Sequence, residues 1–167
     1  MTCPARGRPS LAAFWNDLPR DGSFLLSTVA IETLGTGLVL LFGFIYLHEV
    51  RGFPIGTAGS LLAVPAIVGM AVVGLAGALI DRLGARRIIL AGMTAQMLGN
   101  VLMAFSFTPL TAALALGLLG AAGGVIWPGF NAMIGAVVPS GIRQRYFGIN
   151  FTLVNLGIGI GGVLAGS

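Results

Sequence analysis

The chain has 167 residues, of which 56% are hydrophobic and only 8% are charged, and its mean hydropathy is +0.98. A soluble domain normally carries about a quarter charged residues, because its surface must be hydrated. Five acidic and nine basic residues cannot cover a globule of this length, so the composition excludes an ordinary soluble domain and predicts an all-α integral membrane protein. All nine basic residues are Arg, scattered between apolar runs rather than gathered in a stripe, and nucleic-acid binding is therefore not expected.

Catalytic and metal-binding residue types are almost missing from the sequence. Cys3 is the single cysteine and His48 the single histidine, and they lie far apart. This composition excludes an internal disulfide framework, a Cys/His metal cluster and a credible Ser-His-acid triad. We therefore expect no enzymatic activity and no cofactor, and we interpret His48 as a solvated loop residue.

Residues 1–23 are expected to form a polar N-terminal tail. The stretch from Ser10 to Leu18 has two readings, which the sequence leaves open. It could be a short helix lying on the lipid headgroups, with Phe14, Trp15 and Leu18 facing inward, or it could be disordered. The tail does not resemble a cleaved signal peptide, because the first apolar run starts too late and is too long.

Residues 24–167 contain five apolar segments, each long enough to cross the roughly 30 Å hydrocarbon core of a bilayer. Unpaired backbone groups are not tolerated in lipid, and the runs are too long for barrel strands, so each segment is predicted to be a helix. The segments run from about Phe24 to Leu47, Ile55 to Ile80, Ile88 to Phe107, Leu110 to Val138, and Phe147 to the end.

The connections between these segments predict the topology. Eight of the nine arginines fall in the tail, in the second connection (Asp81 to Arg87) and in the fourth (Pro139 to Tyr146), whereas Arg51 alone falls in the first. The third connection, Thr108-Pro109, carries no charge. The positive-inside rule then places the N-terminus in the cytoplasm, in a multi-pass protein of the plasma membrane, the cell inner membrane in a bacterium.

Glycines and two prolines inside the segments predict close helix packing and local bends. Small residues let membrane helices approach each other, so glycines four residues apart indicate helix-contact faces rather than nucleotide loops. Proline removes a backbone hydrogen bond and should bend its helix. The glycine pairs are Gly120 and Gly124, Gly157 and Gly161, and Gly162 and Gly166, and the prolines are Pro65 and Pro128.

The second connection carries the most specific motif in the chain. It reads Gly77-Ala-Leu-Ile-Asp81-Arg82-Leu-Gly84-Ala-Arg86-Arg87. This pattern resembles the cytoplasmic signature of the major facilitator superfamily (MFS), which lies between membrane helices 2 and 3, and every fixed position is met. The resemblance implies that the chain holds the first five helices of the six-helix N-terminal half of such a transporter.

The residue types of the motif suit a tight turn at a membrane surface. Gly77 would let the end of helix 2 approach a neighbour, and Gly84 would permit the reversal. Asp81 could accept hydrogen bonds from free N–H groups at the start of helix 3. By resemblance to the family, Asp81 with Arg82, Arg86 and Arg87 would latch the two halves of the transporter together in one conformation.

Helices 4 and 5 resemble the family more loosely. Helix 4 has the glycine-rich stretch from Gly117 to Gly124 before Trp127-Pro128, and helix 5 has the glycine run that starts at Gly157. Two departures of this sequence from the family pattern argue against membership in the drug–proton antiporter branch. No Arg lies early in helix 4, and Ile158 and Ile160 occupy places where that branch has a proline.

Glu32 is the strongest candidate for a functional residue inside the membrane. It is the ninth residue of the first apolar segment, roughly 12 Å below the end of that helix. Thr28 and Thr36 lie four residues on either side, so the three side chains form one polar stripe. A carboxylate at this depth is costly unless it is protonated, paired or hydrated. The stripe is expected to face a water-filled cavity and to serve a proton or a cationic substrate, although Glu32 could instead be satisfied by a partner helix.

Other intramembrane polar groups are candidates for the same cavity. Asn131 lies one turn after Trp127 on helix 4, and Asn150 and Asn155 lie on helix 5. They could line the cavity, with Trp127 as an aromatic wall, or they could join helices by hydrogen bonds.

The resemblance implies a secondary transporter of a small solute that works by alternating access, and proton coupling is one option for its energy source. Its expected partners are membrane lipid, a small-molecule substrate of unknown identity and a C-terminal half that the 167 residues do not include. Five helices alone are not expected to transport. The alternative is a small oligomeric membrane protein that acts as a pore, scaffold or anchor.

Overall fold

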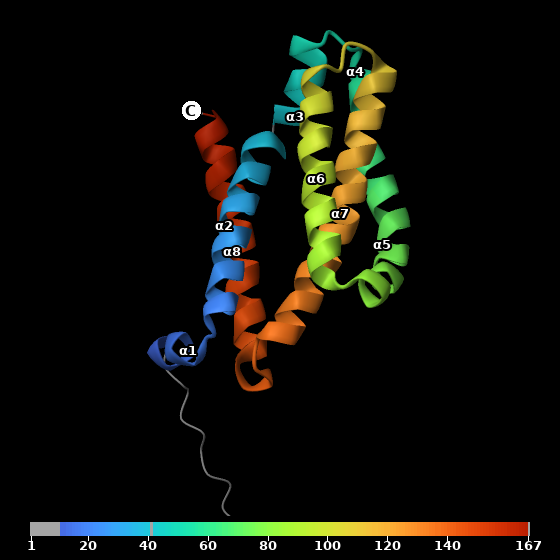
Figure 1. Cartoon of the computed structure of the whole chain (residues 1–167). Helices are drawn as coiled ribbons and strands as arrows, with labels where there is room; N and C mark the ends of the chain where they lie inside the picture. Colours follow the sequence, from blue (N-terminus) through green and yellow to red (C-terminus); the bar gives the residue numbers. More distant parts are fainter. Residues whose placement is uncertain (1–10, 41, 167) are drawn as a thin grey trace, which may run out of the picture.

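The computed structural model describes residues 11–40 and 42–166, and these residues form helices and short connections without any strand. Cys3, Arg6 and Arg8 lie outside the described residues. The elements are α1 (Leu11–Asp17), α2 (Arg20–Leu40), α3 (Phe42–Ile45), the π-helix η1 (Tyr46–Val50), α4 (Ile55–Leu61), α5 (Val64–Leu83), α6 (Ala85–Ala104), α7 (Pro109–Val137) and α8 (Ser140–Gly166) (Figure 1).

Within the described residues, five stretches of helix are long and apolar enough to cross a membrane, which confirms the predicted fold class. The five spans are Arg20–Val50, Ile55–Leu83, Ala85–Ala104, Pro109–Val137 and Ser140–Leu164. Among the described residues, four of the five spans begin before their apolar runs, by the widest margins at Arg20 instead of Phe24 and at Ser140 instead of Phe147. Hydropathy marks only the part of a helix that can sit in hydrocarbon, so polar first turns such as Ser140 to Tyr146 were wrongly assigned to a connection.

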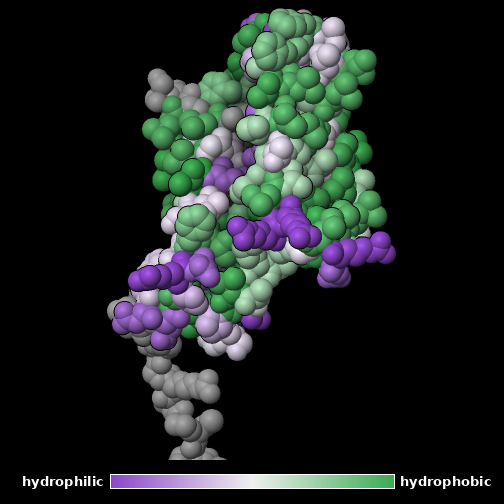
Figure 2. Space-filling model, in the orientation of Figure 1, coloured by the Kyte–Doolittle hydropathy of each residue, from purple (hydrophilic) through white to green (hydrophobic). Residues whose placement is uncertain are grey.

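The two ends of the bundle differ in charge. The connections and helix ends at one end, the arginine-rich end, carry Arg20, Arg82, Arg86, Arg87, Arg143 and Arg145. The opposite end, the Arg51 end, carries Arg51 with His48 and Glu49. Figure 2 shows hydrophilic residues concentrated at the arginine-rich end, while the surface above it is mostly hydrophobic.

Helices α2 and α8 run parallel and pack along their length (Figure 1). Glycines make this close approach possible. A Cβ atom on Gly157 would overlap the Thr33 hydroxyl, and one on Gly161 would overlap the backbone at Leu34. A Cβ atom on Gly37 would likewise overlap the Ile158 backbone. The predicted contact role of Gly157 and Gly161 is therefore confirmed.

Helices α5, α6 and α7 form the second group, with α7 packed against both other helices. A Cβ atom on Gly120 would overlap the Pro65 backbone, and one on Gly124 would lie 2.8 Å from the Gly69 carbonyl oxygen. On the other side of α7, a Cβ atom on Gly92 would lie 2.6 Å from the Ile126 side chain. The predicted contact face of Gly120 and Gly124 is thus the seam between α5 and α7.

The two prolines affect their spans differently. Pro65 is the second residue of α5, and α4 ends just before it at Leu61, so the predicted bend takes the form of a break in the second span. Pro128 lies inside α7, which continues as one helix to Val137. Figure 1 shows the last turns of α7 leaning away from α5 toward α8.

The first span is divided between the two groups. Its α2 part packs against α8, whereas Leu47 in η1 is fully buried in a cluster with residues of α4 and α7. The buried members of this cluster are Leu47, Phe53, Ala58, Leu61, Ala112 and Leu116.

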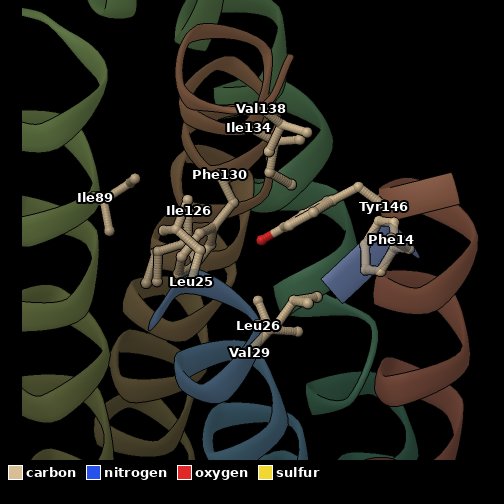
Figure 3. Close-up of a cluster of buried hydrophobic side chains, with 11 residues drawn as sticks. Phe14, Leu25, Leu26, Val29, Ile89, Ile126, Phe130, Ile134, Val138 and Tyr146 are labelled. Carbon is tan, nitrogen blue, oxygen red and sulfur yellow. The ribbon is translucent and has the colours of Figure 1, made fainter. Parts of the chain in front are cut away.

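A second cluster joins the two groups near the arginine-rich end (Figure 3). Its buried residues come from five helices and include Phe14 of α1, which is 1% exposed. The Tyr146 ring points from α8 toward residues of α2 and α7, and its hydroxyl donates to the Gly22 carbonyl at 2.8 Å. Residues 11–17 are helical, which agrees with the first of the two readings of this stretch; Phe14 is buried in the cluster and Trp15 is 52% exposed.

Candidate functional site

The polar stripe on α2 contains one direct side-chain contact. The Thr36 hydroxyl donates to Glu32 Oε1 at 3.1 Å, and both residues are partly buried. The Thr28 hydroxyl instead donates to the Phe24 carbonyl at 3.0 Å, within its own helix. The carboxylate of Glu32 thus has a neutral donor from the same helix, and no described basic residue pairs with it.

The four other cavity candidates differ in exposure. Trp127 and Asn131 are both exposed and lie one helical turn apart on α7. Asn155 is exposed and its Nδ2 donates to the Phe151 carbonyl at 2.7 Å. Asn150, in contrast, is buried at 7% exposure. It lies five residues before Asn155, so the two side chains are about 140° apart around α8, and Asn150 is on the side of the packed core.

The turn between α5 and α6 has the predicted reversal but not the predicted cap. Gly84 has φ +85°, a conformation that favours glycine, and its N–H donates to the Ile80 carbonyl at 2.8 Å. Gly84 itself is the N-cap residue of α6, without any side-chain cap, so the expected capping by Asp81 is wrong. A Cβ atom on Gly77 would meet open space, so its expected close contact is also not found among the described residues.

The charged side chains of this turn all lie on the surface. Asp81, Arg82, Arg86 and Arg87 are not buried, and Asp81 makes no hydrogen bond or ion pair with a described residue. These side chains therefore remain available to lipid or to protein outside the described chain.

The sequence reasoning overlooked several polar residues of α6. Thr94, Gln96 and Asn100 lie inside this span, whose mean hydropathy of 1.3 is the lowest of the five. Gln96 is partly buried and lies between Gly92 and Gly99, which both contact α7. Side-chain amides inside an apolar run were a signal that could have identified them.

Hydrophilic residues line the hollow between the α2–α8 side and the α6 side in Figure 2. A separate groove of about 230 Å³ lies between α5, α6 and α7 and is almost wholly apolar, with Val72, Gly92 and Val125 among its lining residues. None of the candidate residues lines this groove. Among the described residues, no group of three or more His, Cys, Asp or Glu side chains could hold a metal ion.

The arrangement of five spans, with a glycine turn between the second and third, agrees with the comparison with known families. The family model described as Major Facilitator Superfamily matches residues 25–167, which is most of the chain. The chain belongs to the major facilitator superfamily. The motif from Gly77 to Arg87 thus lies in the position that the resemblance implied, between the second and third spans of this MFS chain.

Curated relatives of this MFS chain are named as antiporters and resistance proteins. It is 30% identical over 133 residues to a Na⁺, Li⁺, K⁺/H⁺ antiporter of Planococcus maritimus, covering 77% of the chain and 31% of that protein. It is 31% identical over 138 residues to the quinolone resistance protein NorA of Staphylococcus aureus strain MRSA252, covering 79% and 35%. The chain therefore spans about a third of the length of these relatives.

Proposed function

We propose that this chain supplies the first five helices of a secondary transporter that moves a small solute by alternating access, with Glu32 as the site of a proton or a cation. Family membership supports the transporter class. One relative is named for exchanging alkali cations with protons, which supports a cation or proton as the coupled species.

The observation that carries the proposal is the environment of Glu32. Its carboxylate lies inside the first span, is partly buried and receives a hydrogen bond from Thr36. A carboxylate at this depth costs at least a few kcal/mol when it is charged and unpaired. Binding a proton or a cation removes this cost, so the residue is suited to exchange one for the other.

We further propose that the arginine-rich end faces the cytoplasm, because arginine in short connections is retained on that side of a cell membrane. The accessible Asp81, Arg82, Arg86 and Arg87 would then form a latch with a second half of the transporter at the cytoplasmic surface. Their position on the surface and the lack of an ion-pair partner in the described chain support this role.

Proton release from the purified chain tests the Glu32 proposal. Detergent-solubilised protein in a weakly buffered solution is titrated with NaCl, LiCl, KCl or tetraphenylphosphonium chloride, and the pH is recorded. We expect at least one cation to release protons from the unmodified chain, and Glu32→Gln to reduce this release at least tenfold.

Glu49→Gln is the matched control, because Glu49 is an exposed carboxylate at the Arg51 end, with its Oε1 3.7 Å from Nε2 of the adjacent His48. It should release protons as the unmodified chain does. Equal release from the Glu32→Gln variant, or no release from the unmodified chain with any of these cations, would contradict the assignment.

A further inference from the structure

Arg51 contacts Tyr46 within its own turn and reaches across the Arg51 end of the bundle to Ala104 and Phe107. Its Nε donates to the Tyr46 hydroxyl at 2.8 Å, and its Nη2 donates to the Ala104 carbonyl. Its guanidinium also lies over the Tyr46 ring at 5.0 Å and over the Phe107 ring at 4.6 Å. One side chain thus links the first span to the end of α6, through the charge-assisted and cation–π contacts that a guanidinium makes well.

The π-helix η1 brings Arg51 and Tyr46 together. The Arg51 N–H donates to the Tyr46 carbonyl at 3.0 Å, a bond between residues five apart. The wide turn therefore places both side chains on the same face of the first span. Single π turns of this kind are frequent at functional positions in helices.

The partners of Arg51 and Tyr46 lie at the C-terminus of α6. The Met103 carbonyl accepts from the Tyr46 hydroxyl at 3.1 Å and from the Ser106 hydroxyl at 2.6 Å. The last carbonyls of a helix lack partners within it and carry a partial negative charge, which a guanidinium satisfies well. Arg51, which directly follows the first span, therefore caps α6.

We propose that Arg51 is a positioning residue that clamps η1 onto the end of α6, so that the far part of the first span belongs to the group of α4 to α7 while α2 belongs with α8. The clamp is a property of the described chain and does not depend on the proposed transport activity.

Reactivity of a cysteine introduced at Ser106 tests the clamp. Ser106 is 0% exposed and shares the Met103 carbonyl with Tyr46, so Ser106→Cys in a Cys3→Ser chain should react slowly with a water-soluble maleimide in detergent. Arg51→Ala should raise this rate at least tenfold. Tyr46→Phe, which removes only the hydroxyl, should raise it less, and Arg51→Lys should restore only part of the protection because lysine lacks the planar fork.

Two controls separate clamp release from a general effect. Glu49→Gln changes a neighbouring charge that takes no part in the clamp, and it should leave the rate unchanged. A cysteine introduced at Ala76, which is fully buried in α5, should stay protected when Arg51 is replaced.

Three results would overturn the proposal. The first is an unchanged rate for the Ser106→Cys thiol in an Arg51→Ala chain that elutes like the unmodified protein. The second is an equal gain in reactivity for the Ala76→Cys thiol. The third applies if the Arg51→Ala chain does not fold. The Tyr46→Phe variant then takes its place, and an unchanged rate for the Ser106→Cys thiol in that variant overturns the proposal.

Discussion

Hydroxyl side chains inside the spans bond mostly to their own helices. Among the described residues, five of them donate to the carbonyl four residues earlier, as Thr33 does to Val29 at 2.8 Å. Hydrocarbon offers no partner to a hydroxyl, and this local bond removes the cost of placing it there. The other examples are Ser27, Thr28, Thr94 and Thr152.

Asn150 does not follow this pattern, and replacing it should stabilise the chain. Its Oδ1 is buried and accepts no hydrogen bond from a described residue, a situation that costs about 1–3 kcal/mol. Asn150→Leu replaces the amide by an apolar side chain of similar size, and we expect the free energy of unfolding in detergent to rise by about 1 kcal/mol. Thermal melting with a denaturant series measures this change.

Asn155→Leu is the matched control for Asn150, because Asn155 is an exposed amide on the same helix. Its effect should stay within about 0.5 kcal/mol. A loss of stability in Asn150→Leu would show instead that a donor outside the described residues holds the Oδ1 atom.

The contacts of the candidate polar residues could be predicted from the sequence only in part. The four-residue spacing of Glu32 and Thr36 predicted that they share a face, and the structure joins them. Spacing could not show that Thr28 bonds to its own backbone or that Asn150 and Asn155 lie apart. Those outcomes depend on which side of each helix is packed, and this requires the neighbouring helix to be known.

Helix seams depend on glycines that face backbone rather than side chains. In the α2–α8 seam, Gly161 faces the backbone of Leu34, Gly37 and Leu38. Backbone atoms cannot rotate away from an added side chain, so these positions tolerate no larger residue without separation of the helices.

Gly161→Val should therefore separate α2 from α8, whereas Gly159→Val should not. A Cβ atom on Gly159 meets open space, which makes it a matched control two residues away in the same helix. We expect Gly161→Val to lower the free energy of unfolding by about 1–3 kcal/mol relative to Gly159→Val. Equal melting temperatures of the two variants would be inconsistent with the seam.

Sequence patterns predicted the helices well and their ends and partners less well. Apolar length identified all five spans, and glycine spacing identified the contact faces of α7 and α8. A bend near Pro65 was predicted, but its form as a break before Val64 was not, and neither was the start of α8 at Ser140. Hydropathy indicates which residues can lie in the hydrocarbon core, whereas helix breaks and polar first turns depend on local backbone hydrogen bonds.

The helices of the described residues form two groups with limited contact between them. Helix α8 has few contacts with α7, and both groups meet in the cluster near the arginine-rich end. Phe14 is the contribution of α1 to this cluster. Helix α1 thus helps to join the two helix groups, which otherwise make few contacts with each other.

Phe14→Ala should weaken the connection between the groups. Removing a buried phenylalanine ring typically costs about 3–5 kcal/mol of unfolding free energy. Trp15→Ala is the control, because Trp15 is half exposed and touches Phe14 edge-on at a centroid distance of 5.5 Å. We expect a clearly lower melting temperature only for Phe14→Ala, and an equal decrease in both variants would contradict the anchoring role.

The parallel seam between α2 and α8 also has a consequence for biosynthesis. Tyr146 and Gly22, which form a hydrogen bond across it, are 124 residues apart in the sequence. At about 5–20 residues per second, a ribosome needs roughly 6–25 s to synthesise that interval. During this time α2 has already been made, with Glu32 and its glycine face, while its partner does not yet exist. The first span must therefore remain in the translocon or in lipid without α8 until the fifth span has been made.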